Sequence, residues 1–170
     1  MKQLVFVLAI FFVVILPLAA QEDHDHHHAR NEIGISTGAL YSPNHYEWGT
    51  STHVHYFRTL SLHSHWSLGG GVEQAWLDGT HWAVAAGAKY QLFDRFSLGM
   101  LPGVMFLNHS HEDHGIEKTK SEMKTFFSLH TEAVYDLFHW DRFHLGLAAD
   151  YSWTKNHSHF MIGVHGAFCF

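Results

Sequence analysis

From Glu32 to Phe170, most of the chain alternates between apolar and polar residues. This period of two constrains the fold more than any other feature. The stretch from His157 to Phe170 is the clearest case, because large apolar residues fill one row and histidines and smaller residues fill the other. A period of two is typical of a β-strand, whose successive side chains leave opposite faces. An apolar strand at an open sheet edge invites aggregation, so we expect a sheet that closes into a barrel without edges.

Eight segments follow this period, and each has about the 10 residues that a tilted strand needs to cross an outer membrane. Short aromatic-flanked connections, such as Leu92 to Phe96, alternate with longer polar ones, such as Pro43 to Ser51 and Asn108 to Met123. Pro102 lies inside the fifth segment and predicts either a weakened strand or a bulge. The expected strands are 32–42, 52–60, 66–77, 81–92, 96–107, 124–137, 143–154 and 157–170.

The N-terminal segment predicts export. Lys2 precedes an apolar run from Leu4 to Leu16 and a small-residue site that ends at Ala20, which is the pattern of a cleaved secretory signal. The run is too short to cross a bilayer comfortably as a helix. We therefore expect a signal peptide over residues 1–20, a periplasmic tail over 21–31 that is rich in histidine and acids, and a barrel over 32–170.

An aromatic strand that ends in Phe170, behind an export signal, resembles the closing strand of bacterial outer-membrane β-barrels. With its strand number and loop alternation, the chain from Glu32 to Phe170 is similar to the small eight-stranded barrels of the OmpA/OmpX type. The resemblance implies an all-β, antiparallel, up-and-down transmembrane barrel in the outer membrane. It further implies contact with outer-membrane lipid, periplasmic termini and extracellular longer loops, but fold alone does not define an activity.

Composition narrows the functional classes. Cys169 is the one cysteine, so the chain cannot form an intramolecular disulfide. The formal net charge of −6 argues against nucleic acid as a partner, because such partners favour a basic face. The 19 histidines are the main functional clue, since imidazole is the commonest metal ligand and titrates near neutral pH.

If the apolar rows face lipid, the opposite rows bring imidazoles and carboxylates into a narrow interior, where polar groups must pair or bind something. Such a ligand set suits Zn²⁺ or a similar divalent transition metal. Histidine pairs two residues apart on neighbouring strands would surround an ion. The predicted metal ligands are His53, His55, Glu73, His130, Glu132, Asp150, His159 and His165, with Lys89 and His144 in the same rows.

An alternative is that these residues form a hydrogen-bonded plug that binds no ligand. Histidines expected outside the lumen extend the metal-binding hypothesis, with solvated loops and an inert leader as the competing interpretation. These are His45, His81, His109, His111, His114 and His157 in the predicted extracellular loops, His24, His26, His27 and His28 in the tail, and His63 and His65 near a periplasmic turn.

Capture, storage or sensing of metal is the predicted function, and eight strands leave no open channel for bulk transport. One alternative is a structural or adhesion barrel with pH-responsive histidines, and another is haem capture by paired histidines. A lipid-modifying hydrolase would need a nucleophile such as Ser128 or Ser158 beside a histidine. The sequence carries no motif for such an enzyme, so we do not expect one.

Overall fold

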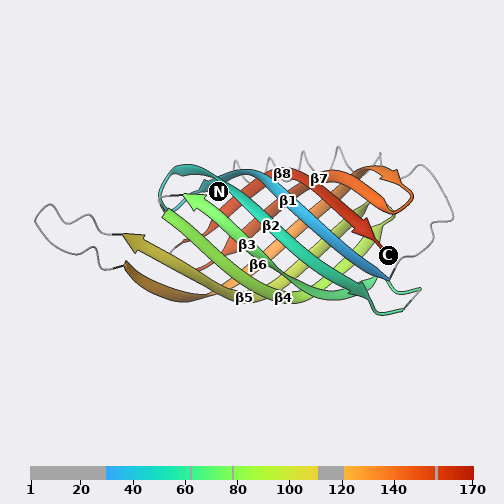
Figure 1. The fold of residues 1–170 in the computed structure, drawn as a ribbon, viewed down its shortest axis with the longest axis horizontal. Coiled ribbons are helices and arrows are strands. Elements are labelled where there is room, and N and C mark those ends of the chain that lie inside the picture. Colours follow the sequence, from blue (N-terminus) through green and yellow to red (C-terminus); the bar gives the residue numbers. More distant parts are fainter. Residues whose placement is uncertain (1–29, 62, 78, 111–120, 156) are drawn as a thin grey trace, which may run out of the picture.

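The computed structural model is a closed barrel of eight antiparallel strands, each paired with the next in sequence (Figure 1). It describes residues 30–61, 63–77, 79–110, 121–155 and 157–170. None of these residues forms a helix long and apolar enough to cross a bilayer. The strands are β1 (Asn31–Ser42), β2 (Glu47–Thr59), β3 (Trp66–Leu77), β4 (Gly79–Phe93), β5 (Phe96–Ser110), β6 (Ser121–Trp140), β7 (Phe143–Trp153) and β8 (His159–Cys169).

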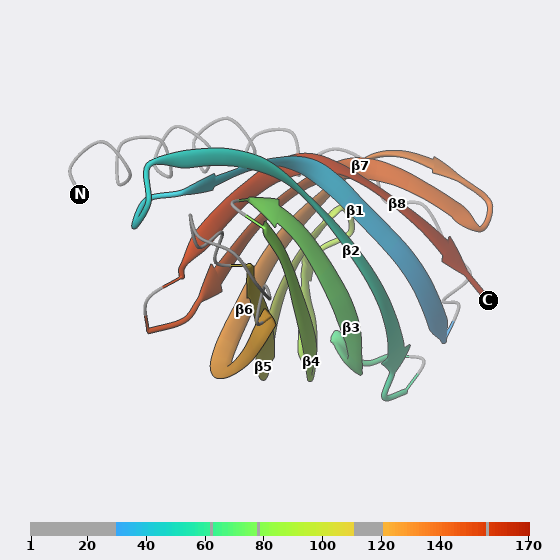
Figure 2. The ribbon, with the colours of Figure 1, turned by 60° about the vertical axis from the view of Figure 1, so that its left-hand side comes forward.

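The barrel closes where β8 pairs with β1, and these two strands lie side by side in both ribbon views (Figures 1 and 2). The Asn31 N–H donates to the Phe170 carbonyl at 2.9 Å, and the Phe170 N–H donates to the Asn31 carbonyl at 2.8 Å. Both ends of the barrel sequence therefore meet at one end of the cylinder, which we call the terminal end. The tight β4–β5 and β6–β7 turns lie at this end as well.

The predicted two-residue alternation is confirmed, and it separates an apolar exterior from an interior that holds most of the buried polar side chains together with apolar ones such as Leu40 and Met161. On β2, Val54 and Tyr56 are exposed, whereas His53, His55 and Phe57 between them are buried. The other strands repeat this pattern, and exposed aromatic rings gather near both ends of the cylinder. Such aromatic belts mark the two interfaces of a membrane barrel. They include Trp66, Trp140 and Phe143 toward the terminal end and Trp48, Trp76 and Trp153 toward the other.

Several strand ends differ from the prediction. β2 begins at Glu47 rather than Thr52, so the β1–β2 connection shrinks to residues 43–46, where Tyr46 adopts a positive φ of 58°. The polar Glu47–Ser51 segment continues the ladder with β1 because backbone pairing extends the sheet regardless of its polar side chains. β5 and β6 pair as far as Ser110 and Ser121, and this hairpin projects beyond the other strands (Figure 1).

Pro102 does not end β5 and causes no register shift. It points to the exterior, and the ladder with β6 continues through it, with Leu129 as its partner. Pairing with β4 pauses at Pro102 and resumes in the same register at Met100, so the predicted bulge is absent from this position. The bulges lie instead between Gln91 and Phe93 and between Asp136 and Phe138.

Candidate metal centre in the barrel interior

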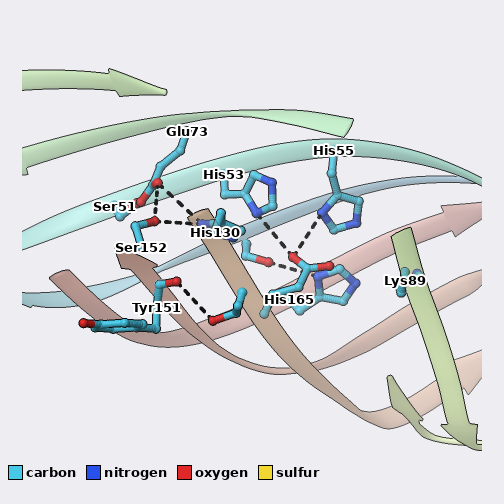
Figure 3. Close-up of polar contacts among 12 residues, drawn as sticks. Ser51, His53, His55, Glu73, Lys89, His130, Tyr151, Ser152 and His165 are labelled. Atoms are coloured by element: carbon cyan, nitrogen blue, oxygen red, sulfur yellow. Dashed lines mark hydrogen bonds and ion pairs between the residues drawn. The ribbon is translucent and has the colours of Figure 1, made fainter. Parts of the chain in front are cut away.

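Glu73 is the best satisfied carboxylate inside the barrel. Its Oε1 accepts a hydrogen bond from Ser51 Oγ at 2.8 Å, and its Oε2 accepts one from Ser152 Oγ at 3.0 Å (Figure 3). Oε1 also accepts a hydrogen bond from His159 Nε2 at 2.8 Å. These partners come from β2, β7 and β8, which the closed sheet places around one interior volume. Glu73 therefore serves as a hydrogen-bonding hub, and it fixes the proton of His159 on Nε2.

The same hub sets the tautomer of His130. The Ser152 hydroxyl donates its hydrogen bond to Glu73. The Ser152 oxygen can therefore only accept a hydrogen bond from His130 Nδ1, which lies 2.8 Å away and must carry the ring proton. The second ring nitrogen, Nε2, then carries a lone pair, and it is buried without a hydrogen-bond partner among the described residues. A histidine held in this way by an outer hydrogen-bond chain is arranged as a metal ligand.

Glu132 lies two residues after His130 on β6, and His53 approaches both from β2. His53 Nδ1 lies 3.5 Å from Glu132 Oε2, and His55 Nδ1 lies 3.9 Å from the same oxygen (Figure 3). Neither Glu132 oxygen has a hydrogen-bond partner in the described structure, although the residue is only 3% exposed. One donor atom from each of His53, His130 and Glu132 lies within 4.8 Å of the others. We call these three residues, with Asp150, the interior centre.

Asp150 adds a second buried carboxylate. It pairs with Glu132 across β6 and β7, both side chains face inward, and its Oδ1 has no hydrogen-bond partner within the described part of the chain. Buried carboxylate oxygens that accept no hydrogen bond are costly unless a proton or a cation compensates the negative charge. The donor set of two imidazoles and two carboxylates fits Zn²⁺, which is bound by such ligands in tetrahedral sites.

A small cavity of about 10 Å³, measured as the space open to the centre of a water molecule, adjoins the interior centre. His53, Glu73, Ser128 and His130 contribute to its wall. This space is near the lower limit for a single water molecule, so it admits an ion but no organic substrate. This cavity thus has room for a small ion rather than for a metabolite.

A second interior group contains Glu32, His55 and His165, which also bring one donor atom each within 4.8 Å of one another. Here a cation is already in place, because Lys89 Nζ forms an ion pair with Glu32 Oε1. His55 Nε2 lies 3.2 Å from the same oxygen, and His165 Nδ1 lies 3.1 Å from Ser36 Oγ. This group is therefore closer to the hydrogen-bonded plug than to a metal site.

All eight predicted ligands face the interior, and each is at most 5% exposed. The structure divides them differently from the prediction. His53 joins His130 and Glu132 across the lumen, whereas His55 and His165 belong with Glu32, and His159 is bonded to Glu73. The ligand groups therefore form across the lumen as well as between neighbouring strands.

Sequence reasoning missed Glu32, Asp136 and His139 as members of ligand groups. Glu32 is the first residue of the first predicted strand and belongs to its inward row. It could therefore have been predicted as an interior ligand from the alternation alone. Asp136 and His139 have opposite parity, so a strict period of two cannot place both inside. The β6 bulge places both there.

The prediction that His81 belongs to an exterior loop is wrong. β4 already begins at Gly79, so His81 occupies an inward position of a strand and is only 6% exposed. His45 is exposed as expected and stacks on His157, with ring centroids 5.2 Å apart. His63 and His65 are exposed at the β2–β3 turn. The predicted signal peptide, the tail histidines, His111 and His114 lie outside the described residues, and so does the side chain of His109.

The geometry does not support the hydrolase alternative. Ser128 is 1% exposed, and its Oγ has no hydrogen-bond partner among the described residues, so no imidazole activates it. Ser158 Oγ donates to the Thr154 carbonyl at 3.0 Å rather than to a histidine. A nucleophile bonded to its base is the feature by which such a site is recognised.

Neither a comparison with protein-family profiles nor one with curated proteins finds a match to this chain. Solved structures do match. Ail, the attachment invasion locus protein of Yersinia pestis, in complex with the heparin analogue sucrose octasulfate, has a TM-score of 0.60 and 12% identity, over 84% of this chain and 99% of that chain. Neisserial surface protein A has a TM-score of 0.55 and 10% identity, over 82% of this chain and 96% of that one.

The N-terminal β-barrel domain of Pseudomonas aeruginosa OprF has a TM-score of 0.51 and 12% identity, over 84% of this chain and all of that domain. Identities this low support the fold and carry no residue-level function. The strand number, the closure of β8 on β1 and the apolar exterior agree with these matches. The chain has the fold of the small eight-stranded outer-membrane β-barrels, as its alternating pattern predicts.

Proposed function

We propose that this barrel lies in the bacterial outer membrane and binds a late first-row divalent metal ion at the interior centre. Zn²⁺ is the ion that we expect there. In this proposal His53, His130 and Glu132 supply three ligands, and Asp150, which pairs with Glu132 in the ladder, turns toward them to supply the fourth. The observation that carries the proposal is the orientation of His130, whose Nδ1 proton is committed to the Ser152–Glu73 chain while Nε2 has no partner among the described residues.

Charge balance supports the same assignment. Two neutral imidazoles and two carboxylates give the site a charge of −2, which a divalent cation neutralises. The neighbouring Glu32 group is already neutralised by Lys89, so metal is expected at the interior centre in preference to it. Because a late transition metal prefers imidazole and carboxylate nitrogen and oxygen donors, Zn²⁺, Ni²⁺ and Cu²⁺ are the ions to test.

The enclosed lumen limits what the metal can do there. A packed eight-stranded barrel offers no continuous aqueous path, so an ion bound inside is held rather than conducted. We infer capture, storage or sensing, with the terminal end in the periplasm and the opposite loops outside the cell. In this proposal the predicted histidine-rich tail, residues 21–31, would offer ions on the periplasmic side.

Isothermal titration of Zn²⁺ into the refolded, metal-stripped barrel in detergent tests the proposal. His130→Gln removes one ligand, and we expect affinity to fall by more than the roughly 10–100-fold that follows when a residue hydrogen-bonded to a ligand is changed. His63→Gln is the matched control, because His63 is exposed at the β2–β3 turn. Equal Zn²⁺ binding by both variants and the unchanged chain would refute a site at the interior centre.

Adhesion is the second candidate, and the likeness to Ail with its bound heparin analogue favours it. Sulfated sugars are polyanions, however, and this chain has a formal net charge of −6 with 10 lysines and arginines. Because a free imidazole becomes positive below about pH 6.5, acidification would add positive charge to a histidine-rich surface. Heparin binding that rises on acidification and persists with a chelator would support adhesion. Binding of Zn²⁺ at neutral pH without heparin binding would support the metal function.

A further inference from the structure

A third ligand group lies at the terminal end, well away from the interior centre. Asp136 and His139 come from the end of β6, and His144 comes from the start of β7, directly opposite His139 in the ladder. His144 is six residues from Asp150, which is about 20 Å along a strand. The group is half-buried rather than enclosed.

The β-bulge in β6 creates this group. Residues 136 and 139 would face opposite sides of a regular strand, but the register with β7 shifts between Asp136 and Phe138. The extra residue turns both side chains to the interior, and bulges commonly re-aim side chains in this way. An irregularity that adds His139 to the inward row is thus what assembles the ligand group.

The donor atoms converge on one carboxylate. His139 Nε2 lies 3.2 Å and His144 Nδ1 lies 3.4 Å from the same oxygen, Asp136 Oδ2, and the two rings stack with centroids 4.2 Å apart. The other oxygen, Asp136 Oδ1, is buried without a hydrogen-bond partner among the described residues. One donor atom of each residue lies within 4.8 Å of the others.

A fourth donor comes from the closing strand. Cys169, the only cysteine of the chain, is the last residue of β8 and lies beside His144, close enough to interact with its ring. Two imidazoles, a carboxylate and a thiolate are ligands that Zn²⁺ combines in tetrahedral sites. We call Asp136, His139, His144 and Cys169 the end cluster.

We propose that the end cluster is a second metal site, which binds Zn²⁺ or a similar thiophilic divalent ion and ties β8 to the β6–β7 hairpin. Binding displaces the thiol proton to solvent and forms the metal–sulfur bond. The alternative is a hydrogen-bonded rim without metal. Because the end cluster is partly exposed, its ions exchange with solvent more readily than ions in the lumen. The proposal does not depend on the interior centre.

The thiol provides the test. The refolded, metal-stripped barrel is labelled with a bulky maleimide, which can react only at Cys169, with and without Zn²⁺. At ten times the dissociation constant about one site in eleven is free, so labelling should slow about tenfold. His139→Gln should abolish this protection, because it removes a ligand without touching the thiol.

Two variants keep the test decisive. His53→Gln changes the interior centre and should leave the protection of Cys169 intact, so the two sites fail or succeed separately. Asp136→Asn repeats the loss of a ligand in case His139→Gln does not refold, and the heat-dependent gel mobility of the barrel reports folding. Labelling that Zn²⁺ does not slow, or protection that survives both His139→Gln and Asp136→Asn, would overturn the second site.

Discussion

Replacing Glu132 by glutamine distinguishes a metal centre from a hydrogen-bonded plug. In a plug the change should lower the stability of the metal-free barrel, whereas in a metal centre it should raise it. Both oxygens of Glu132 are buried without hydrogen-bond partners among the described residues, and Asp150 faces it from β7. An unsatisfied buried polar atom costs about 1–3 kcal/mol. Glu132→Gln removes the negative charge and adds two donors. We therefore expect the metal-free variant to gain about 1–3 kcal/mol in free energy of unfolding.

Zn²⁺ should offset most or all of this gain, because it stabilises the unchanged chain more than the variant. At 100 times its dissociation constant, a ligand stabilises the folded state by about 2.7 kcal/mol. If Glu132→Gln weakens binding 100-fold, the same Zn²⁺ concentration gives the variant only about 0.4 kcal/mol. Urea unfolding in lipid vesicles, followed by tryptophan fluorescence with and without Zn²⁺, measures both quantities.

Glu73→Gln is the matched control within the same lumen. Glu73 accepts hydrogen bonds from Ser51, Ser152 and His159, so this change should destabilise the metal-free barrel by about 3–5 kcal/mol. It also disturbs the outer chain of His130 and should weaken Zn²⁺ binding roughly 10–100-fold. A metal-free Glu132→Gln barrel as destabilised as Glu73→Gln, or one that keeps the full stabilisation by Zn²⁺, would refute the reasoning.

Three further changes test other parts of the account. In Gly71→Ala the new Cβ would lie 2.5 Å from His53 Nε2 and would displace the ring. We expect a lower Zn²⁺ affinity in calorimetry and a loss of about 1–3 kcal/mol in free energy of unfolding. Unchanged affinity would contradict the placement of His53. Lys89→Met removes the cation beside Glu32 and leaves only His55 near the same oxygen, which should cost about 3–5 kcal/mol in urea unfolding, and the added change Glu32→Gln should restore most of this. Val84→Arg places a charge on the exposed outer face and should cost about 2–4 kcal/mol in vesicles, whereas a soluble barrel would tolerate it. Bound Zn²⁺ should be released on acidification, because protons compete with the metal for imidazole.

The fold could be predicted from sequence because a half-buried strand records its two faces in alternate residues. Val54, Tyr56 and their buried neighbours His53 and His55 show how directly side-chain type indicates orientation. Strand ends were harder to predict. Glu47–Ser51 is polar, yet it belongs to β2 because backbone pairing continues past the point where the apolar pattern fades.

The site was only half predictable for a related reason. Alternation indicates which residues point inward, and the eight predicted ligands do so. It does not indicate which of them meet across the lumen, since that depends on the tilt and stagger of the closed sheet. His53 meets His130 from the opposite wall, and the end cluster exists only because a bulge shifts His139 to the inward row.

Zinc K-edge X-ray absorption on the refolded barrel tests the central claim most directly, and the variant His139→Gln is used so that the end cluster does not contribute. The account predicts that one Zn²⁺ remains after desalting, with four nitrogen and oxygen ligands at about 2.0–2.2 Å and imidazole scattering from two histidines. A barrel that retains no zinc, or a zinc ion with six oxygen ligands and no imidazole, would contradict it.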